Sequence, residues 1–200
     1  IGAIKVSVAA KNRFFTFEDS GENSLQITAC NRAASGYVRI PSTFGGKKVT
    51  AIGMRAFERC EDITGIELPE SLITIGEYAF EGCHSLSAIT IPSRVETIGR
   101  MAFSRCNKLR NVTIGEGLEQ LNDMVFNRCA LLQSINFSGS SVAPLLEDGD
   151  SPFNLVHRDA KVYIGSGCTG FGSSYGGLPV ECPTCKIQLG GSLVTNLLRQ

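Results

Sequence analysis

The chain has 200 residues and no formal net charge at pH 7, and 42% of its residues are hydrophobic while 19% are charged. This composition is typical of a globular protein, and the length suits one domain or one domain plus a further segment. The balanced charge provides no general attraction to nucleic acid or to an anionic membrane. No apolar run is long enough to cross a bilayer. We therefore expect no nucleic-acid partner and no direct membrane insertion.

Residues 1–36 predict a capping hairpin. The chain begins at Ile1 without an initiator methionine or a signal-peptide pattern, so we expect a piece of a longer protein. Apolar residues alternate with polar ones around Phe15 and again around Leu25, and turn-forming residues separate the two stretches. A hairpin here would cover the open edge of whatever structure follows it.

The middle of the chain is repetitive. Four cysteines recur every 23 residues, as do four phenylalanines that each follow Ala or Val. Fixed-period similarity is the signature of a solenoid, in which stacked coils bury a shared apolar core. We therefore predict a solenoid over residues 37–165, with regular repeats at 49–137. The two columns are Cys60, Cys83, Cys106 and Cys129, and Phe57, Phe80, Phe103 and Phe126.

The period changes at both ends of the regular repeats. Val162 follows Ile135 by 27 residues, which predicts an insertion at 138–152 and a degenerate coil at 153–165. Ile40 precedes Leu68 by 28 residues, which places extra residues between 41 and 49. Together these registers predict about five to six coils.

Each repeat contains two short extended segments. In the copy that begins at Cys83, the pattern around Ile89 and Ile91 predicts a strand that ends at Pro92. Val95 and Ile98 predict a second extended stretch before Gly99. Residues 100–106 are too few for a full helix and fit one helical turn that points Phe103 inward. Strands of neighbouring coils should then pair in a parallel ladder.

The repeat L-x-x-I-x-(L/I)-P-x-x-L-x-x-I-G-x-x-A-F-x-x-C resembles the BspA-like, treponemal-type leucine-rich repeat. The match is close at residues 63–137 and looser over 38–180. This resemblance implies an α/β leucine-rich repeat fold, a right-handed and strand-rich solenoid with short helical turns. It also implies a non-catalytic protein-protein interaction module, usually part of a surface or secreted adhesion protein. An extracellular or cell-surface location is expected on the same ground.

The C-terminal part contains a second cysteine motif. Residues 166–185 are rich in Gly, Ser and Cys and should close the solenoid, while residues 186–200 form a tail or begin a further segment. Cys182 and Cys185 form a C-x-x-C pair, which is half of a zinc site or a redox dithiol. We favour a disulfide or free thiols in this cap, with Cys168 as the preferred partner of Cys182 or Cys185.

Other chemistries are weaker readings of the same residues. A zinc site would need further ligands, for which only Cys168, Cys30 and His157 are loosely available. A redox dithiol would need the start of a helix in a βαβ unit, which a solenoid end does not supply. The repeated cysteines Cys60, Cys83, Cys106 and Cys129 fit a tight interior position, so we interpret them as structural thiols.

No catalytic constellation is present in the sequence. His84 occupies a variable repeat position and His157 lies in the degenerate coil, so both are expected at the surface. The known hydrolase, metalloprotease and nucleotide-binding motifs are absent. Glu147, Asp148 and Asp150 match no complete calcium loop and are interpreted as a solvated turn. We therefore expect no enzymatic activity, no metal and no cofactor.

The outward positions of the strand ladder are the candidate binding site. Side chains alternate along a strand, so the residues between the inward Ile, Leu and Val face solvent. The partner would be another protein of unknown identity, and Arg110 and Tyr163 would be its main anchors. The alternative is a structural or scaffolding subunit of a larger assembly in an organelle or cell compartment. The predicted face is Glu67, Thr90, Arg110, Asn111, Thr113, Gln133, Asn136, Lys161 and Tyr163.

Overall fold

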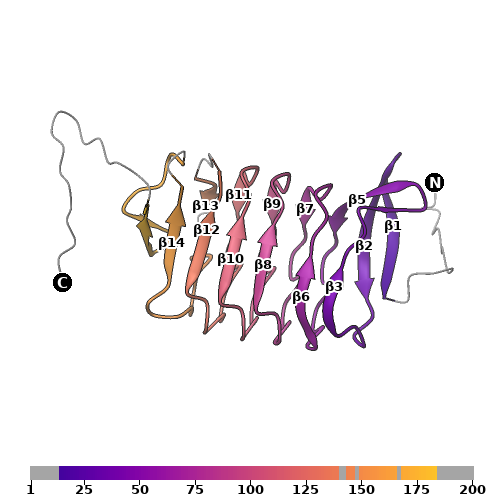
Figure 1. The fold of residues 1–200 in the computed structure, drawn as a ribbon, viewed down its shortest axis with the longest axis horizontal. Helices are drawn as coiled ribbons and strands as arrows, with labels where there is room; N and C mark the ends of the chain where they lie inside the picture. The colour runs from indigo at the N-terminus through magenta and orange to yellow at the C-terminus, as the bar shows by residue number, and fades with distance from the viewer. Residues whose placement is uncertain (1–13, 140–142, 147–148, 166–167, 184–200) are drawn as a thin grey trace.

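A computed structural model describes residues 14–139, 143–146, 149–165 and 168–183. The chain forms a row of stacked coils that progresses along one axis from the N-terminal strands to the C-terminal strands (Figure 1). Strands of successive coils pair in parallel. The fold is therefore a β-solenoid, as the leucine-rich repeat pattern predicted.

One ladder contains the main strands of the coils from β8 to the C-terminal end, and we call it the main ladder. Its strands pair in the order β15-β16-β14-β12-β10-β8. Two earlier strands, β3 (Gly36–Arg39) and β6 (Ile63–Glu67), pair with each other in a separate sheet on the same side (Figure 1). The main ladder consists of β8 (Ala88–Ile91), β10 (Asn111–Ile114), β12 (Ser134–Phe137), β14 (Lys161–Ile164), β15 (Ser174–Tyr175) and β16 (Leu178–Glu181).

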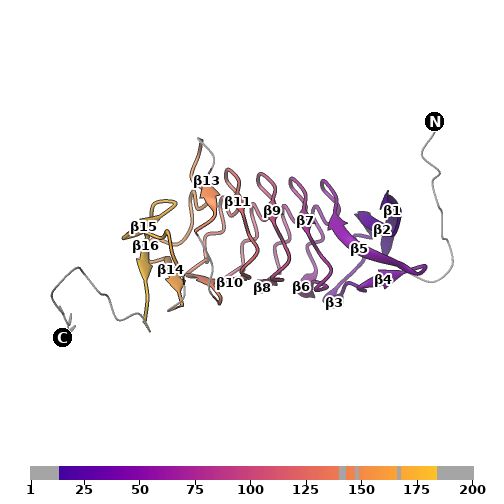
Figure 2. The ribbon, with the colours of Figure 1, turned by 90° about the horizontal axis from the view of Figure 1, so that it is seen from above.

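A second ladder runs along another side of the coils (Figure 2). It begins with the antiparallel hairpin of β1 and β2, and β2 then pairs in parallel with β5. The short strand β4 pairs with β5 in the antiparallel sense. The members are β1 (Phe15–Gly21), β2 (Ser24–Cys30), β4 (Thr43–Phe44), β5 (Lys47–Ile52), β7 (Thr74–Ile75), β9 (Thr97–Ile98), β11 (Gln120–Leu121) and β13 (Leu145–Leu146).

The strand registers agree with the periods read from the sequence. Ile135 pairs with Val162, which confirms the 27-residue step across the insertion. Val38 pairs with Ile66, which confirms the 28-residue step upstream. Both irregular coils therefore keep their apolar residues in line with the regular ones, and the segments that hold the extra residues contribute the short strands β4 and β13 to the second ladder described above.

Stacked aromatic rings run through the core. Phe103 is fully buried, and its ring centroid lies 5.0 Å from that of Phe80 and 5.5 Å from that of Phe126. The stack continues to Phe57 at one end and to Phe153 at the other. Neighbouring rings are tilted by 23° or less. This confirms that the repeated phenylalanines point inward.

The prediction of short helical turns was wrong, because the described part of the chain contains no helix. Two residues of the turn, Met101 and Arg105, have left-handed backbone angles, with φ of 53° and 60°. The intervening Phe103 N–H donates to Val125 O of the next coil, 2.9 Å away. A helical turn would direct its N–H groups to carbonyls of its own segment. Here the bonds alternate, because the N–H groups of Ala102 and Ser104 donate to Gly99 O and Met101 O of their own turn at 3.2 and 3.0 Å. No continuous helix forms, so the described residues have an all-β rather than an α/β structure.

Hairpins lie at both ends of the described chain. The β1–β2 hairpin stands where the N-terminal cap was predicted, and β15–β16 stands within the predicted C-terminal cap. Tyr175 is buried there and donates its hydroxyl to Pro144 O at 2.9 Å. The predicted tail at 186–200 lies outside the described residues. No helix in the described segments is long and apolar enough to span a membrane.

Candidate protein-binding face

The main ladder buries one set of side chains and presents the other to solvent. On β10, Val112 and Ile114 are buried, whereas Asn111 is exposed and Thr113 is half-buried. Eight of the nine predicted face residues lie on this outward side or at its edge, and the ninth, Glu67, lies on β6 in the neighbouring sheet. Thr90, Arg110, Asn111 and Gln133 are exposed, and Glu67, Thr113, Asn136, Lys161 and Tyr163 are half-buried.

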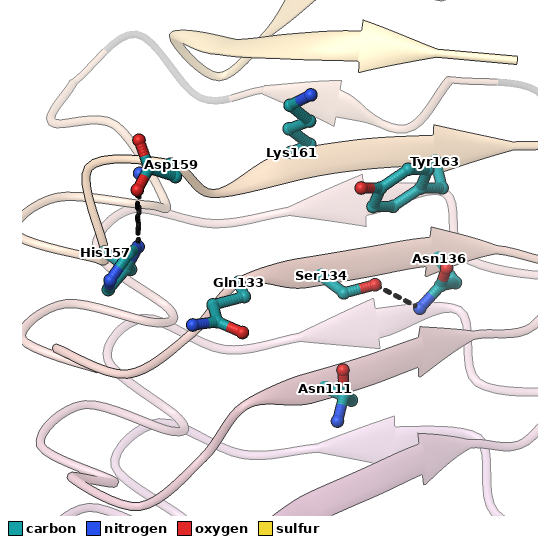
Figure 3. A pocket seen from close by; sticks show the side chains of 8 residues that line it. All are labelled: Asn111, Gln133, Ser134, Asn136, His157, Asp159, Lys161 and Tyr163. Carbon is teal, nitrogen blue, oxygen red and sulfur yellow. Dashed lines mark hydrogen bonds and ion pairs between the residues drawn. The ribbon is translucent and has the colours of Figure 1, made fainter.

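An open depression of about 530 Å³ lies over β10, β12 and β14 (Figure 3), and we call it the C-terminal depression. Five of the predicted residues line it. Of the other three lining residues, only His157 was considered above, as a surface residue of the degenerate coil. The lining is Asn111, Gln133, Ser134, Asn136, His157, Asp159, Lys161 and Tyr163.

Hydrogen bonds orient the polar groups in the middle of this depression. The Asn136 amide donates to Ser134 Oγ at 2.8 Å (Figure 3). It also donates to Val112 O at 3.3 Å. These bonds fix the amide plane between two coils. Asn136 also pairs in register with Tyr163 on the adjacent strand, so an oriented amide and an aromatic ring lie side by side.

Charged groups border the same depression. Lys161 Nζ donates to Glu181 Oε1 at 2.5 Å, and this bond raises the pKa of Lys161 above its ordinary value. The Asp159 N–H donates to His157 Nδ1 at 3.2 Å, and the Asp159 carboxylate lies 3.8 Å from the same nitrogen. The depression therefore offers positive, negative and neutral hydrogen-bonding groups together.

A second depression of about 530 Å³, the N-terminal depression, lies over β6 and β8 on the same side of the solenoid. It contains the predicted residues Glu67 and Thr90, and Tyr37 from β3. Tyr37 is 68% exposed, and its ring covers Gly65, where an added Cβ would lie 2.8 Å from the ring. Glu67 accepts hydrogen bonds from Tyr37 Oη at 3.4 Å and from Arg39 Nε at 2.9 Å.

Tyr37 and Arg39 are not among the predicted face residues. Ile40 was placed in line with Leu68, and alternation back along the strand would have placed both Arg39 and Tyr37 outward. His157 was expected in a solvated turn, but it is half-buried and lines the C-terminal depression. Its position depends on how the degenerate coil folds beside the regular ones, which the repeat pattern does not describe.

The cysteine column consists of buried thiols that bond between coils. Cys83, Cys106 and Cys129 donate to Phe57 O, Phe80 O and Phe103 O, at 3.2, 3.3 and 3.1 Å. Burial raises the pKa of Cys83 to about 12 and holds the pKa of Cys106 well above its ordinary value. Cys83 and Cys106 therefore remain protonated at neutral pH, and the three thiols act as small hydrogen-bonding core groups.

The C-terminal cysteines do not show the preferred pairing of Cys168 with Cys182. Cys168 is a free thiol that points toward Gly139 O, at 3.5 Å, whereas Cys182 is disulfide-bonded. Cys168 therefore does not supply the expected disulfide partner of Cys182. Cys185 lies outside the described residues. In the described segments, no group of three or more His, Cys, Asp or Glu could hold a metal ion.

His84 and the acidic turn were also predicted at the surface. His84 is half-buried, and its Nδ1 lies 3.0 Å from Arg105 O and 3.3 Å from the Asn107 amide. Its Nε2 lies 3.9 Å from the Glu61 carboxylate. His84 thus links variable positions of adjacent coils. Of the acidic turn, Glu147 and Asp148 lie outside the described residues.

Solved structures with the same fold come from bacteria. The leucine-rich repeat protein of T. pallidum is 23% identical, with a TM-score of 0.59 over 78% of this chain and 80% of that one. A leucine-rich cell-surface protein of Faecalibacterium prausnitzii is 22% identical, with a TM-score of 0.52 over 90% of this chain and 56% of that one. The pneumococcal vaccine antigen PcpA is 19% identical, with a TM-score of 0.50 over 72% and 36% of the two chains. These likenesses show the fold.

The sequence comparisons identify the family. No curated protein sequence matches the chain. The family model for the BspA type leucine rich repeat region matches residues 37–145 in 6 copies. That range covers more than half of the chain and contains the cysteine and phenylalanine columns together with β4 to β12. The chain therefore belongs to the BspA-type leucine-rich repeat family.

Proposed function

We propose that this chain is a non-catalytic protein-interaction module that binds its partner on the outward face of the main ladder. The observation that carries this proposal is the alignment of both depressions along one side of the solenoid. Between them the face presents Arg110 and Thr113. Leucine-rich repeat proteins typically use extended surfaces of stacked repeats for protein binding.

The chemistry of the face suits a folded protein or an extended peptide with polar groups. Tyr37, Tyr163 and Arg110 supply the residue types that contribute most binding energy in protein interfaces. The amide of Asn136 is held in place before a partner arrives, which lowers the entropy lost on binding. The mixed charges around Lys161 and Asp159 would select a partner by complementarity rather than by general attraction.

Substitution of the two predicted anchors tests the site. A photo-reactive amino acid at Thr113, between the two depressions, would first identify the bound protein by crosslinking and mass spectrometry. We then expect Arg110→Ala together with Tyr163→Ala to weaken binding of that protein at least about tenfold, the equivalent of about 1.4 kcal/mol. Arg128→Ala is the matched control, because Arg128 is exposed on the turn rather than on the ladder face.

The affinity of the double variant decides whether the ladder face is the site. Loss of affinity in the double variant, with an unchanged control and unchanged circular dichroism, would support the ladder face as the site. Equal affinity of the wild type and the double variant would show that the partner binds elsewhere, and the proposed site would then be wrong.

The same proposal places the protein at the cell surface or outside the cell, in an adhesion role. Its support is the family and the cell-surface description of the Faecalibacterium prausnitzii protein, which shares the fold. Labelling of intact source cells with a membrane-impermeant biotin reagent is expected to modify this protein. Labelling only after the cells are broken would contradict the surface location.

A structural subunit of a larger assembly is the second candidate. Leu145 and Leu146 favour it, because they are 75% and 39% exposed on β13, at the end of the second ladder. Exposed apolar side chains on a sheet edge are typical of contact with another chain. Crosslinking mass spectrometry of native material would support this candidate if one neighbour were found in constant ratio and linked near β13 rather than to the main-ladder face.

A further inference from the structure

Charge is distributed unevenly along the repeats, although the chain as a whole is neutral. The turn and main strand of the coil at residues 101–114 contain three basic residues and no acidic one. The equivalent residues 55–68, two coils earlier, contain four acidic and two basic residues. Because the coils stack along one axis (Figure 1), this difference in sequence places a positive and a negative region at different points along the solenoid.

Lys108 and Arg110 supply the positive charge beside the main ladder. Leu109 between them is fully buried, whereas Lys108 and Arg110 are both exposed. Arg110 directly precedes β10, so the two cations lie where that strand begins. A ligand on the outward face can therefore reach both of them.

The neighbouring coils do not neutralise these two charges. The Arg110 N–H donates to Ser87 O at 2.9 Å, and the Gln133 N–H donates to Arg110 O at 3.0 Å. The residues beside Arg110 on the two adjacent coils are thus uncharged. Among the described residues, Lys108 and Arg110 take part in no ion pair.

The carboxylates at the C-terminal depression are engaged by other groups. Glu181 accepts the hydrogen bond from Lys161 at 2.5 Å. The Asp159 carboxylate lies 3.6 Å from Arg158 Nε and 3.8 Å from His157 Nδ1. Each of these acidic groups is paired with a cation of its own. The excess positive charge at this end of the face therefore comes from the pair at the start of β10.

Hydrogen-bonding groups for a peptide adjoin the two cations. Asn111 follows Arg110 in the chain, and Gln133 is bonded to its carbonyl, and both of them line the C-terminal depression. A guanidinium binds a carboxylate through two parallel hydrogen bonds, and side-chain amides pair with peptide N–H and C=O groups. This combination suits a peptide whose carboxylates contact the cations while its backbone lies over the amides.

The N-terminal depression has the opposite character. Glu67 and Glu70 line it, and its lining residues include no Lys or Arg. An acidic segment would be repelled there and attracted at the C-terminal depression. The two depressions would therefore fix the position of an acidic segment along the face.

We propose that the partner segment that docks at the C-terminal depression is an acidic peptide, whose Asp or Glu carboxylates bind Lys108 and Arg110. Clusters of basic side chains are a recurring means of recognising acidic peptide motifs. This inference rests on the proposed function, because it names the chemistry of the partner that the ladder face receives. It also adds Lys108 to the predicted face.

Fluorescence anisotropy of the full chain with two labelled peptides tests the proposal. One peptide carries glutamates spaced by glycines, and the other carries glutamines at the same places. We expect the glutamate peptide to bind at least about tenfold more tightly, because only its side chains are charged. Added salt should weaken its binding, since exposed charges are screened.

A double variant assigns the binding to the two cations. Lys108→Gln together with Arg110→Gln should lower the affinity for the glutamate peptide at least about tenfold. Lys48→Gln together with Arg128→Gln is the matched control, because it also removes two positive charges, from exposed positions on β5 and on a turn. The control should retain the affinity of the wild type.

Absence of binding, equal binding of the two peptides, or equal loss in the two double variants would overturn the proposal. Heparin bound through Lys108 and Arg110 in preference to the glutamate peptide would overturn it as well, because the ligand would then be a sulfated polysaccharide. In each case, capture of a protein by the photo-reactive residue at Thr113 would still support the proposed function. Peptide binding as expected, with no protein captured at Thr113 in source material, would count against the proposed function instead.

Discussion

Phe103 contributes to two interfaces between coils, because its ring packs against a phenylalanine on each side. Its ring lies nearly parallel to that of Phe80, with 3° between the planes, and to that of Phe126, with 10°. It has no exposed surface. Removal of the ring would therefore leave a cavity shared by three coils, and the β-solenoid backbone has little freedom to close it because each coil is bonded to both neighbours.

We expect Phe103→Ala to lower the free energy of unfolding by about 3–5 kcal/mol. Phe103→Leu, which fills more of the space, should lose markedly less. Urea unfolding followed by circular dichroism would measure both. A loss close to zero in the alanine variant would contradict the inward assignment of the phenylalanine column.

The buried thiols make stability depend on alkaline pH. The ordinary thiol pKa is 9.0, and burial raises that of Cys83 to about 12. Above about pH 9 the unfolded chain releases this proton while the folded chain retains it, so the contribution is complete below pH 9 and declines as the pH rises toward 12. At pH 10 the expected loss from Cys83 is about 1.4 kcal/mol.

Urea unfolding at pH 8 and pH 10, with a reductant present, would check this expectation. The wild type should lose more stability between the two values than Cys83→Ala, because the variant lacks the titrating thiol. An identical pH dependence of the two proteins would show that Cys83 does not retain its proton in the folded state.

At the scale of the element, the turn between the second ladder and the phenylalanine depends on close backbone approach. An added Cβ at Gly99 would lie 2.6 Å from Glu77 N and 2.8 Å from Gly76 C of the preceding coil. The Gly99 N–H donates to Ile75 O at 2.8 Å. The next coil has Asn122 at this position, and there the side-chain amide donates to Ile98 O at 2.7 Å. The Asn122 side chain is thus accommodated because its amide makes the hydrogen bond between coils that the backbone N–H makes at Gly99.

We expect Gly99→Ala to cost about 1–3 kcal/mol, because the methyl group must displace the backbone of the preceding coil. Gly172→Ala is the matched control, since an added Cβ there would meet its nearest atom at 3.7 Å and no left-handed angle is involved. Thermal or urea unfolding would compare the two. Equal stability of Gly99→Ala and the control would contradict the close approach.

At the scale of the molecule, each coil contacts only its neighbours, and the two ends are hairpins rather than regular coils. Stability in such a structure is the sum of the coils and of the interfaces between them, so the ends open first. We expect amide exchange to be slowest near Phe80 and Phe103 and to become faster toward β1 and toward β16. Hydrogen exchange with mass spectrometry would measure this gradient, and uniform protection along the described chain would contradict it.

The repeat period by itself determined the solenoid, the inward columns and the strand registers. A 23-residue repeat of apolar residues predicts a solenoid, because a coil buries its apolar face only against another coil in the same register. Even the 27-residue and 28-residue steps were readable, since Val162 and Ile40 had to remain in line with Ile135 and Leu68. The predicted face followed from simple alternation along the strands.

Only the tertiary structure decided the conformation of the turns and the composition of the depressions. The turn before Cys106 has the length of one helical turn, but hydrogen bonds to the next coil direct its backbone into left-handed angles instead. Tyr37, His157 and Asp159 join the face because irregular coils fold beside regular ones. Local periodicity specifies which residues face inward, whereas contacts between dissimilar coils depend on how their backbones stack.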